Sequence, residues 1–516
     1  MFIGLDIGTS ATKGVVIDAE GRIIAHASSA YEHDRPGPAW AEHDPAVWAG
    51  AACDVLRRLA GSPGVERGSL RGLGLSGQMH GSVFLDDAAL RAAGSAEIAA
   101  VRPAIMWNDQ RSAAQCAAIE SAVGRRRLID RCGNAAIPGF TAPKILWLRE
   151  HEPRAFERTA RVVLPKDFVR LVLTGEVATD AGDASGTLLL DIETRGWASD
   201  LLGALGLDPS LFPTVLESCE VAGRVTRWAA ERTGLPVGLP VVAGSGDNQC
   251  AAVGAGVVEP GVALSVLGTS GVVYVHAGEP RRDVRNDPPG RVHCVCAADG
   301  SSSRRGGWAN TGVMLSAAGS LHWARSVLAP GVAFEALLAE AEAAPPGCDG
   351  LLFLPHLSGE RCPYPDPGAR GSWVGLTSRH TRGHLVRAVL EGVACTMAII
   401  LDIVRGLPVE PSVVRLSGGG NRSALWRAMQ ADAYGLAVVA MEGDEGPALG
   451  AALMASVGVG GHATLAEAAR AATREVGRIE PGPARGVYRE LTARYRAAFA
   501  AMTPVLHACA AAERAG

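Results

Sequence analysis

Ile3-Gly4-Leu5-Asp6-Ile7-Gly8-Thr9-Ser10 opens the chain, and Leu264-Ser265-Val266-Leu267-Gly268-Thr269-Ser270-Gly271 repeats its pattern just past the middle. Each stretch runs an apolar strand into a Gly-Thr-Ser turn and then into a second apolar strand. Glycine lets the backbone turn tightly, and successive N–H groups with hydroxyls beside them suit phosphate oxygens. Gly-Thr-Ser is also a common turn, so one copy alone would carry little weight. Two copies predict two similar domains that hold a nucleotide between them.

Length and composition set wide bounds on the class of protein. A chain of 516 residues is too long for one core and should divide into at least two domains. Hydrophobic residues at 48% and charged residues at 20% describe an ordinary soluble globular protein. A net charge of −4 gives no electrostatic case for nucleic acid or an anionic membrane as partner.

The apolar and cysteine patterns point to a cytoplasmic protein. No basic leader precedes the first apolar stretch, which Asp6 interrupts, so that stretch predicts a strand and not a signal peptide. No apolar run is long enough to span a bilayer. The 11 cysteines are scattered, and the nearest pair, Cys294 and Cys296, has no second pair at zinc-finger spacing. Reduced, mostly buried thiols are expected.

Two common phosphate-binding motifs are excluded. The only lysines, Lys13, Lys144 and Lys166, do not follow glycine, so no Walker A motif is present. The stretch Gly72-Leu73-Gly74-Leu75-Ser76-Gly77 matches G-x-G-x-x-G, but a turn and a strand should follow it, whereas a dinucleotide fingerprint opens a helix.

The hydrophobic pattern predicts α/β layers, because strands alternate with helices along most of the chain. Residues 1–30 should form a strand meander. Further strands are expected at 72–75, 239–243, 263–275, 351–354 and 413–416, and helices at 47–59, 112–123, 313–328, 384–405 and 425–434.

Asp247 is the best candidate for a general base. The loop Gly244-Ser245-Gly246-Asp247-Asn248 follows an apolar strand, and open α/β sheets bind ligands at such strand ends. In phosphoryl transfer to an alcohol, a positioned aspartate accepts the hydroxyl proton. Alternatively, Asp247 caps the following helix, and local sequence favours neither interpretation.

Asp6 is the candidate for a magnesium site. A carboxylate beside phosphate-binding amides would repel a nucleotide unless a cation lay between them, so we expect Asp6 to hold Mg²⁺ through water. The alternative is an aspartate that caps its own turn. Lys13, at the end of the same segment, either faces the phosphates or is a solvated strand-end residue.

Three more polar loops follow predicted strands. Ser417-Gly418-Gly419-Gly420-Asn421-Arg422-Ser423 stands between a strand and a helix, where glycines allow close approach to an anion or a base. Gly77-Gln78-Met79-His80-Gly81 and Met106-Trp107-Asn108-Asp109-Gln110-Arg111 combine hydrogen-bonding groups with an indole, as a polyhydroxylated ligand such as a sugar requires. Taken singly, His80 or Trp107 is more simply explained by core packing.

Together these motifs resemble the FGGY carbohydrate kinases, and within them the branch that acts on D-xylulose. The similarity runs from residue 1 to about residue 460. Gly-Gln-Met-His-Gly and Leu164-Pro165-Lys166-Asp167 are its most specific parts, and they occur in family order with these further motifs: Asp6-Ile7-Gly8-Thr9-Ser10, Trp107-Asn108-Asp109, Thr141-Ala142-Pro143-Lys144, Gly246-Asp247-Asn248, Leu267-Gly268-Thr269-Ser270-Gly271, Leu357-Ser358-Gly359-Glu360-Arg361 and Gly418-Gly419-Gly420.

The resemblance implies an actin-like ATPase fold of two ribonuclease H-like domains. Residues 1–240 would bind mainly the sugar, residues 241–485 mainly ATP, and residues 486–516 would form a helical tail. It implies ATP-dependent phosphorylation of D-xylulose at its 5-hydroxyl, with Asp247 as base and Asp6 beside Mg²⁺. The sugar would contact Gln78, Met79, His80, Trp107, Asn108 and Asn248, and the nucleotide Thr9, Ser10, Lys13, Gly268, Thr269, Gly418, Gly419 and Asn421.

Some positions depart from the family pattern and leave the substrate open. They are Gln249, Cys250, His322, Cys362 and Tyr364. Another ketose or polyol, such as ribulose or xylitol, is the first alternative. An actin-fold protein that uses ATP as a conformational switch is the second, although such a switch needs no base beside a sugar-like pocket. The partners implied are sugar and ATP, and a homodimer is left open.

Overall fold

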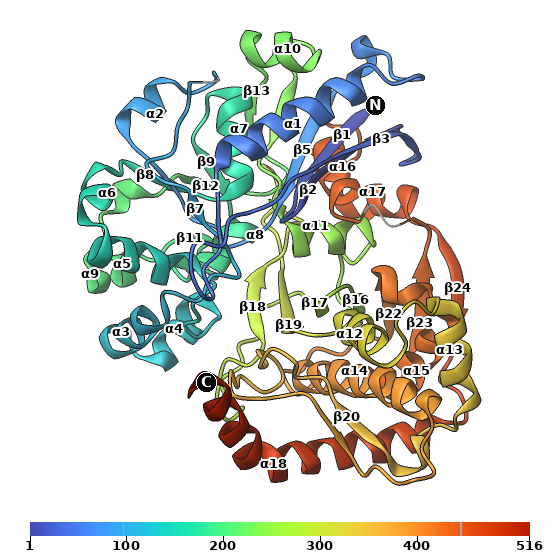
Figure 1. Ribbon diagram of the computed structural model, residues 1–516. Helices are drawn as coiled ribbons and strands as arrows, with labels where there is room; N and C mark the ends of the chain where they lie inside the picture. The colour runs from blue at the N-terminus through green and yellow to red at the C-terminus, as the bar shows by residue number, and fades with distance from the viewer. Residues whose placement is uncertain (96, 444–445, 516) are drawn as a thin grey trace.

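The computed structural model describes residues 1–95, 97–443 and 446–515, and it divides into two bodies, each built on a seven-stranded mixed sheet (Figure 1). The blue-to-green part of the chain forms most of one body, and the yellow-to-red part forms most of the other. Both bodies combine sheet and helix layers, so the predicted α/β class is confirmed.

The first sheet has the strand order β13-β14-β5-β1-β2-β3, with β15 paired to β5. The β1–β2–β3 meander is antiparallel, whereas β1, β5 and β14 run parallel. Helices α1 and α7 pack on this sheet. The elements are β1 (Phe2–Ile7), β2 (Ala11–Ile17), β3 (Ile23–Ala30), β5 (Gly72–Gly77), β13 (Val221–Arg224), β14 (Pro240–Val242), β15 (Ser245–Gly246), α1 (Pro45–Ala60), α7 (Pro165–Thr174) and α10 (Arg227–Thr233).

The second sheet has the order β18-β19-β17-β16-β22-β23-β24. Its centre repeats the arrangement of the first, because the β16–β17 hairpin is antiparallel and β22 pairs with β16 in parallel. The elements are β16 (Val262–Leu267), β17 (Gly271–Ala277), β18 (His293–Cys296), β19 (Trp308–Met314), β22 (Val413–Ser417), β23 (Ala437–Met441), β24 (Glu475–Ile479), α12 (Ala318–Leu328), α13 (Phe334–Ala343), α14 (Arg382–Arg405), α15 (Ala424–Tyr434) and α18 (Arg485–Ala515).

Smaller elements complete the two bodies. Those of the N-terminal half are β4 (Glu42–His43), β6 (Val83–Leu85), α2 (Asp87–Arg91), β7 (Ala104–Ile105), α3 (Ala113–Val123), α4 (Arg125–Cys132), α5 (Thr141–His151), α6 (Pro153–Arg158), β8 (Arg161–Val163), β9 (Ala178–Asp180), α8 (Ala181–Ala184), β10 (Leu190–Asp191), β11 (Gly196–Trp197), α9 (Ser199–Leu205) and β12 (Thr214–Leu216). The others are α11 (Asp247–Gly254), β20 (Leu352–Leu354), β21 (Ser372–Val374), α16 (Gly446–Gly458) and α17 (Leu465–Ala472).

Two predicted boundaries differ from the structure. The helix expected from residue 313 begins at Ala318, because residues 308–314 form β19 and pair with β17 and β18. Strands β14 and β15 belong to the first sheet although they lie at or beyond residue 240, where we expected the first domain to end.

Helix α16 comes late in the chain but belongs to the first body, since it packs on β1 and β5 of the first sheet (Figure 1). A Cβ atom on Gly4 would lie 1.8 Å from the Ala448 carbonyl oxygen, and one on Gly74 would lie 1.9 Å from that of Ala451. Only glycine allows this approach. The G-x-G-x-x-G stretch is thus a strand, as predicted, and a helix packs against it.

The C-terminal helix α18 belongs to the core of the second body. Its buried face joins the main cluster of that body through Tyr488, Leu491, Tyr495 and Phe499. No helix of the described residues combines the length and apolarity needed to cross a bilayer.

Candidate active site

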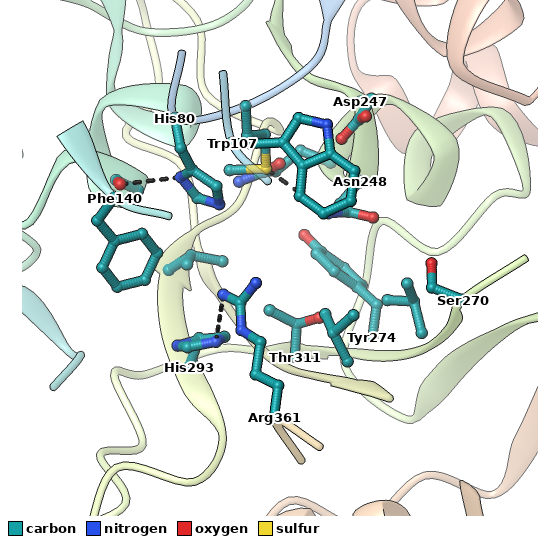
Figure 2. A pocket seen from close by; sticks show the side chains of 16 residues that line it. His80, Trp107, Phe140, Asp247, Asn248, Ser270, Tyr274, His293, Thr311 and Arg361 are labelled. Carbon is teal, nitrogen blue, oxygen red and sulfur yellow. Dashed lines mark hydrogen bonds between the residues drawn. The ribbon is translucent and has the colours of Figure 1, made fainter. Parts of the chain in front are cut away.

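A pocket of about 130 Å³ lies where the two bodies meet (Figure 2). The first body contributes the loop after β5, the loop after β7 and the start of α11, and the second body contributes β17, β18, β19 and Arg361. The lining residues are Met79, His80, Trp107, Phe140, Gly186, Asp247, Asn248, Gln249, Ser270, Val272, Tyr274, His293, Val295, Thr311, Val313 and Arg361.

Asp247 is the first residue of α11, and Gly246 is the N-cap, so the capping alternative does not hold. The preceding strand β15 pairs with the end of β5, which places Asp247 beside the Met79–His80 loop. Removal from bulk water, and then the charge of Asp6, raise the pKa of Asp247 to about 7. A carboxylate with this pKa is suited to accept a proton near neutral pH.

Asp6 lies at the end of β1, opposite Ser76 of β5 in the parallel register. The Ser76 hydroxyl donates a 2.7 Å hydrogen bond to Asp6 Oδ1. The charge of Asp6 raises the pKa of Asp247, so the two carboxylates lie near enough to interact electrostatically. Oxygen donors of this kind fit a hard divalent cation, which binds through carboxylates, water and phosphate oxygens.

The first Gly-Thr-Ser turn is tied to the predicted sugar loops. The Trp107 indole Nε1 donates to Thr9 Oγ1 at 3.0 Å, and Gln78 Nε2 donates to the Gly8 carbonyl at 3.2 Å. Gln78 is only 1% exposed and does not line the pocket, so its side chain supports the turn. Asn108 also lies outside the pocket lining.

His80 is held with its free ring nitrogen available to a ligand. Its Nδ1 lies 2.9 Å from the Gly186 carbonyl, which can only accept, so Nδ1 carries the proton and Nε2 is an acceptor. Burial and the charges of Arg361 and Lys144 lower the pKa of His80 well below its ordinary value. The ring is therefore neutral.

The backbone at His80 has a φ of 66°, a left-handed conformation that is uncommon outside glycine. Lys144 Nζ donates to the His80 carbonyl at 3.0 Å and to the Gly139 carbonyl at 2.8 Å, and Thr141 Oγ1 donates to the His80 carbonyl at 3.1 Å. The Thr141-Ala142-Pro143-Lys144 motif thus holds the strained loop in place.

Asn248 and Gln249 connect Asp247 to its surroundings. Asn248 Nδ2 lies 3.6 Å from the Met79 sulfur, and Gln249 Nε2 donates to the Gly182 carbonyl at 2.9 Å. Gln249 lines the pocket, whereas Cys250 is buried with its thiol toward the Ser245 carbonyl.

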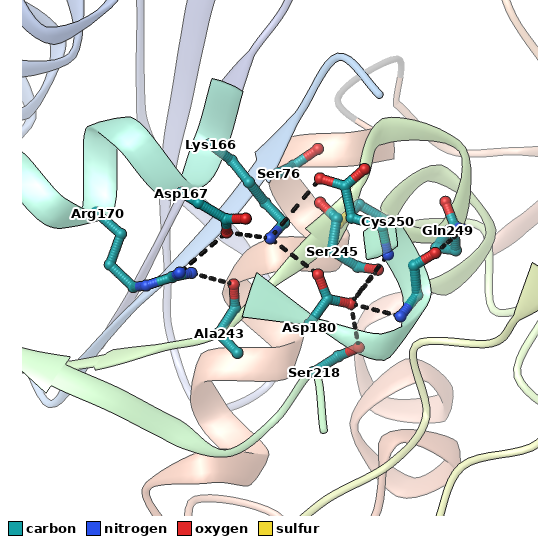
Figure 3. Close-up of polar contacts among 12 residues, drawn as sticks. Ser76, Lys166, Asp167, Arg170, Asp180, Ser218, Ala243, Ser245, Gln249 and Cys250 are labelled. Atoms are coloured by element: carbon teal, nitrogen blue, oxygen red, sulfur yellow. Dashed lines mark hydrogen bonds and ion pairs between the residues drawn. The ribbon is translucent and has the colours of Figure 1, made fainter. Parts of the chain in front are cut away.

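A buried charged network anchors the Asp247 loop from behind (Figure 3). Lys166 Nζ lies 2.6 Å from Asp167 Oδ1, 2.8 Å from Asp180 Oδ1 and 3.7 Å from Asp183 Oδ2. The Ser245 hydroxyl donates to Asp180 Oδ2 at 2.8 Å, two residues before Asp247. Burial raises the pKa of Asp183 well above its ordinary value.

The second Gly-Thr-Ser turn is joined to α12. Backbone amides at the start of that helix donate to the carbonyls of Gly268 and Thr269 at 2.9 to 3.1 Å. Gly418 has a φ of 88° and approaches Leu267 so closely that a Cβ would lie 2.7 Å from its carbonyl oxygen. The two glycine segments therefore pack directly on each other.

A larger cavity of about 580 Å³ lies beside these glycines, lined by Ala318, Leu321, His322, Phe334, Glu335, Leu338, Ala339, Glu342, Gly419, Gly420, Arg422, Ser423, Ala424, Leu425 and Trp426. Of the predicted nucleotide residues only Gly419 lines it. Asn421 is 7% exposed, and its Oδ1 accepts from Gln430 Nε2 at 2.6 Å, so its side chain holds the loop. Ser10 and Lys13 are exposed on the first hairpin.

Sequence reasoning missed the wall that the second body contributes to the pocket. Tyr274, His293 and Thr311 lie on strands whose apolar pattern gave no signal of a binding face. Arg361 ends the quoted motif Leu357-Ser358-Gly359-Glu360-Arg361, and that membership was the signal that could have marked it for attention.

Two family models match most of the chain. Residues 1–254 match the N-terminal domain of the FGGY family of carbohydrate kinases, and residues 263–459 match its C-terminal domain. A xylulose kinase of Klebsiella pneumoniae is 40% identical over 89% of this chain and 90% of its own.

Solved structures show the same two-domain, actin-like arrangement. A "xyloylose kinase" from Brucella ovis is 35% identical, with a TM-score of 0.87 over 98% of this chain and 99% of its own. A xylulose kinase from Rhodospirillum rubrum is 32% identical, also with a TM-score of 0.87, over 98% of this chain and 99% of its own. With both family domains matched and its relatives covered over nearly their whole length, the chain belongs to the FGGY family of carbohydrate kinases.

Proposed function

We propose that this kinase transfers the γ-phosphoryl group of ATP to the terminal 5-hydroxyl of D-xylulose, with Asp247 as general base. The observation that carries the proposal is the placement of Asp247, with a pKa raised to about 7, in a pocket that also holds His80, Asn248 and Trp107. The names of the relatives with 32 to 40% identity support D-xylulose as the acceptor.

Asp247 accepts the proton of the attacking hydroxyl. A base with a pKa near 7 is largely deprotonated at pH 7.5 to 8 and still basic enough to take a proton as the new O–P bond forms. The breaking bond joins the γ-phosphorus to the bridging oxygen of ADP, and catalysis depends mainly on positioning and charge neutralisation.

Asp6 would hold Mg²⁺ beside the transferred phosphoryl group, and the ion would neutralise charge on the phosphate oxygens. The backbone amides and serine hydroxyls of the two Gly-Thr-Ser turns, with the Thr269 hydroxyl of the second, are available to the phosphates. We assign the base of the nucleotide to the cavity beside Gly419 and Gly420, which is large enough for an adenosine and is bordered by Phe334 and His322.

The sugar side of the site combines an acceptor, a donor and a flat wall. His80 Nε2 accepts from a sugar hydroxyl, Asn248 Nδ2 donates, and the Trp107 indole covers one face. An ATP-driven switch would not need this set of groups beside a base. Closure of the two bodies over the substrate would exclude water from the reaction.

The test is ADP release by the purified protein with Mg-ATP and D-xylulose, D-ribulose, L-ribulose, xylitol or glycerol. We expect strong stimulation by D-xylulose that is lost in Asp247→Ala. Asp87→Ala is the matched control, since Asp87 also begins a helix but is exposed and outside the pocket. Stimulation by another sugar would change the substrate and keep the mechanism. No stimulation by any sugar would favour a nucleotide switch.

A further inference from the structure

We propose that Arg361, supplied by the second body, binds the C1–C2 end of an open-chain ketose and makes the kinase select ketoses over polyols. The inference rests on the proposed function, because it takes the hydroxyl at the other end of the substrate to lie at Asp247. Arg361 lines the same pocket as Asp247, and Figure 2 shows Asp247 near the upper edge of the pocket and Arg361 near its lower edge.

Arg361 is a half-buried cation that lines the pocket, and it has no anionic partner in the described part of the chain. Its Nη2 lies 2.8 Å from His293 Nε2, its guanidinium is 5.7 Å from the Phe140 ring centroid, and its Nε has no hydrogen-bond partner. Burial lowers the pKa of Arg361 to about 10, which still leaves it charged near neutral pH. A charge with this little access to water needs hydrogen-bond acceptors.

The carboxylate of the adjacent residue, Glu360, already accepts hydrogen bonds from other groups. Glu360 accepts from the backbone amides of Leu315 at 2.9 Å and Arg361 at 2.8 Å, and from His356 Nδ1 at 2.9 Å. The guanidinium of Arg361 therefore gains no ion pair from the residue beside it, and its remaining donors are left for a ligand in the pocket.

A chain of hydrogen bonds fixes the direction of the guanidinium. Asn134 Nδ2 donates to the Cys132 carbonyl at 2.7 Å, so Asn134 Oδ1 is the acceptor for His293 Nδ1 at 2.6 Å. His293 must then carry its proton on Nδ1 and accept from Arg361 on Nε2. Burial and the adjacent charge lower the pKa of His293 well below its ordinary value, which keeps the ring neutral.

The geometry of a hydroxyketone matches such a donor. The C2 carbon of a ketose is planar, so its carbonyl oxygen and the C1 hydroxyl oxygen can lie in one plane and accept two parallel N–H groups. In a polyol, C2 is tetrahedral and the two oxygens are staggered. Arg361 would therefore gain two well-aligned hydrogen bonds from a ketose and lose at least one with a polyol.

The experiment compares kcat/KM for D-xylulose and xylitol in the wild-type protein, Arg361→Gln and Arg361→Lys. For Arg361→Gln we expect kcat/KM for D-xylulose to fall about 10- to 100-fold, as for loss of charged hydrogen bonds, while that for xylitol changes less than about threefold. Arg361→Lys keeps the charge but not the fork, so the same loss of selectivity is expected. Arg379→Gln, an exposed arginine of the same body, is the control and should match the wild type.

Each outcome separates this inference from the proposed function. If the wild-type protein is not stimulated by D-xylulose, the proposed function fails. If it is stimulated and both variants keep the wild-type ketose-to-polyol ratio, the role of Arg361 is overturned. D-Xylonate is included because a guanidinium also binds carboxylates. If the wild-type protein prefers D-xylonate to D-xylulose and the Arg361 variants lose that preference, the ligand of Arg361 is a sugar acid and not a ketose. Thermal stabilisation of each variant by Mg-ATP, equal to that of wild type, verifies that it is folded.

Discussion

The two bodies share a central hairpin but differ in the polar groups behind it. In the first body Lys166, Asp167, Asp180 and Asp183 form a fully buried charged network. In the second, a buried cluster beside the glycine loop consists of neutral groups, with the Ser265 hydroxyl 3.0 Å from Gln430 Oε1 and 2.9 Å from the Tyr434 hydroxyl.

The hairpins differ in the same way. Asp6 stands two residues before the first Gly-Thr-Ser, whereas Val266 stands at that place before the second. Both turns can present amides and hydroxyls to phosphates, but only the first adds a charge. We propose from this comparison that the first body carries the reactive groups, whereas the second carries the nucleotide cavity and the selectivity that we assign to Arg361. The predictions below test that division.

The largest effect is expected from removing the base. Asp247→Asn preserves the shape of the side chain but cannot accept the proton, so kcat with D-xylulose should fall about 10²- to 10⁴-fold. Steady-state ADP release measures it. Loss of less than about tenfold would contradict a base role for Asp247.

The next effect concerns the buried networks. Lys166→Met leaves Asp180 and Asp183 without their cation, while Asp167 keeps its ion pair with Arg170, and it should lower the free energy of unfolding by about 3–5 kcal/mol. Gln430→Leu in the second body leaves only neutral groups unpaired and should cost about 1–3 kcal/mol. Urea unfolding followed by circular dichroism compares the two. Equal losses would mean that the networks do not differ in energy.

A moderate effect is expected from pH. Because the pKa of Asp247 is raised to about 7 and the base must be deprotonated, activity should rise with pH. We expect kcat/KM for D-xylulose to increase about tenfold per unit below pH 7 and to level off above it. A profile between pH 5.5 and 8.5 at saturating Mg-ATP measures this. A flat profile would show that no group with this pKa limits the reaction.

The smallest effect separates the two turns. Thr9→Val removes the acceptor of the Trp107 indole and should raise KM for the sugar about fivefold, as for the loss of one hydrogen bond. Thr269→Val should instead raise KM for ATP by a similar factor. The KM for sugar and the KM for ATP are measured in both variants. If both variants change the same one of these two constants, the proposed division of roles between the two bodies is contradicted.

Much of the fold was predictable because it follows from local pattern. The strand meander, the β5 strand and helices such as α1 and α14 have strong hydrophobic periodicity and agree with the predictions within a few residues. The start of α12 was missed because the apolar residues Val313 and Met314, which also suit a helix, instead end β19 and pair with β17.

The site was predictable to the level of loops but not of side chains. Met79, His80, Trp107, Asp247 and Asn248 share one pocket as expected. In the same loops, Gln78 and Asn421 direct their amides into the protein. A motif identifies the loop that approaches a ligand, but the direction of each side chain depends on strand register and on distant carbonyl groups.

The scarcity of lysine gives the protein an unusual surface for amine chemistry. Lys144 and Lys166 have no exposed area, while Lys13 is exposed on β2 beside the first hairpin. Amine-directed acylating reagents and crosslinkers therefore meet a single accessible lysine side chain, next to the turn that we assign to phosphate binding. A label or surface linkage at Lys13 would report from a defined point at this turn.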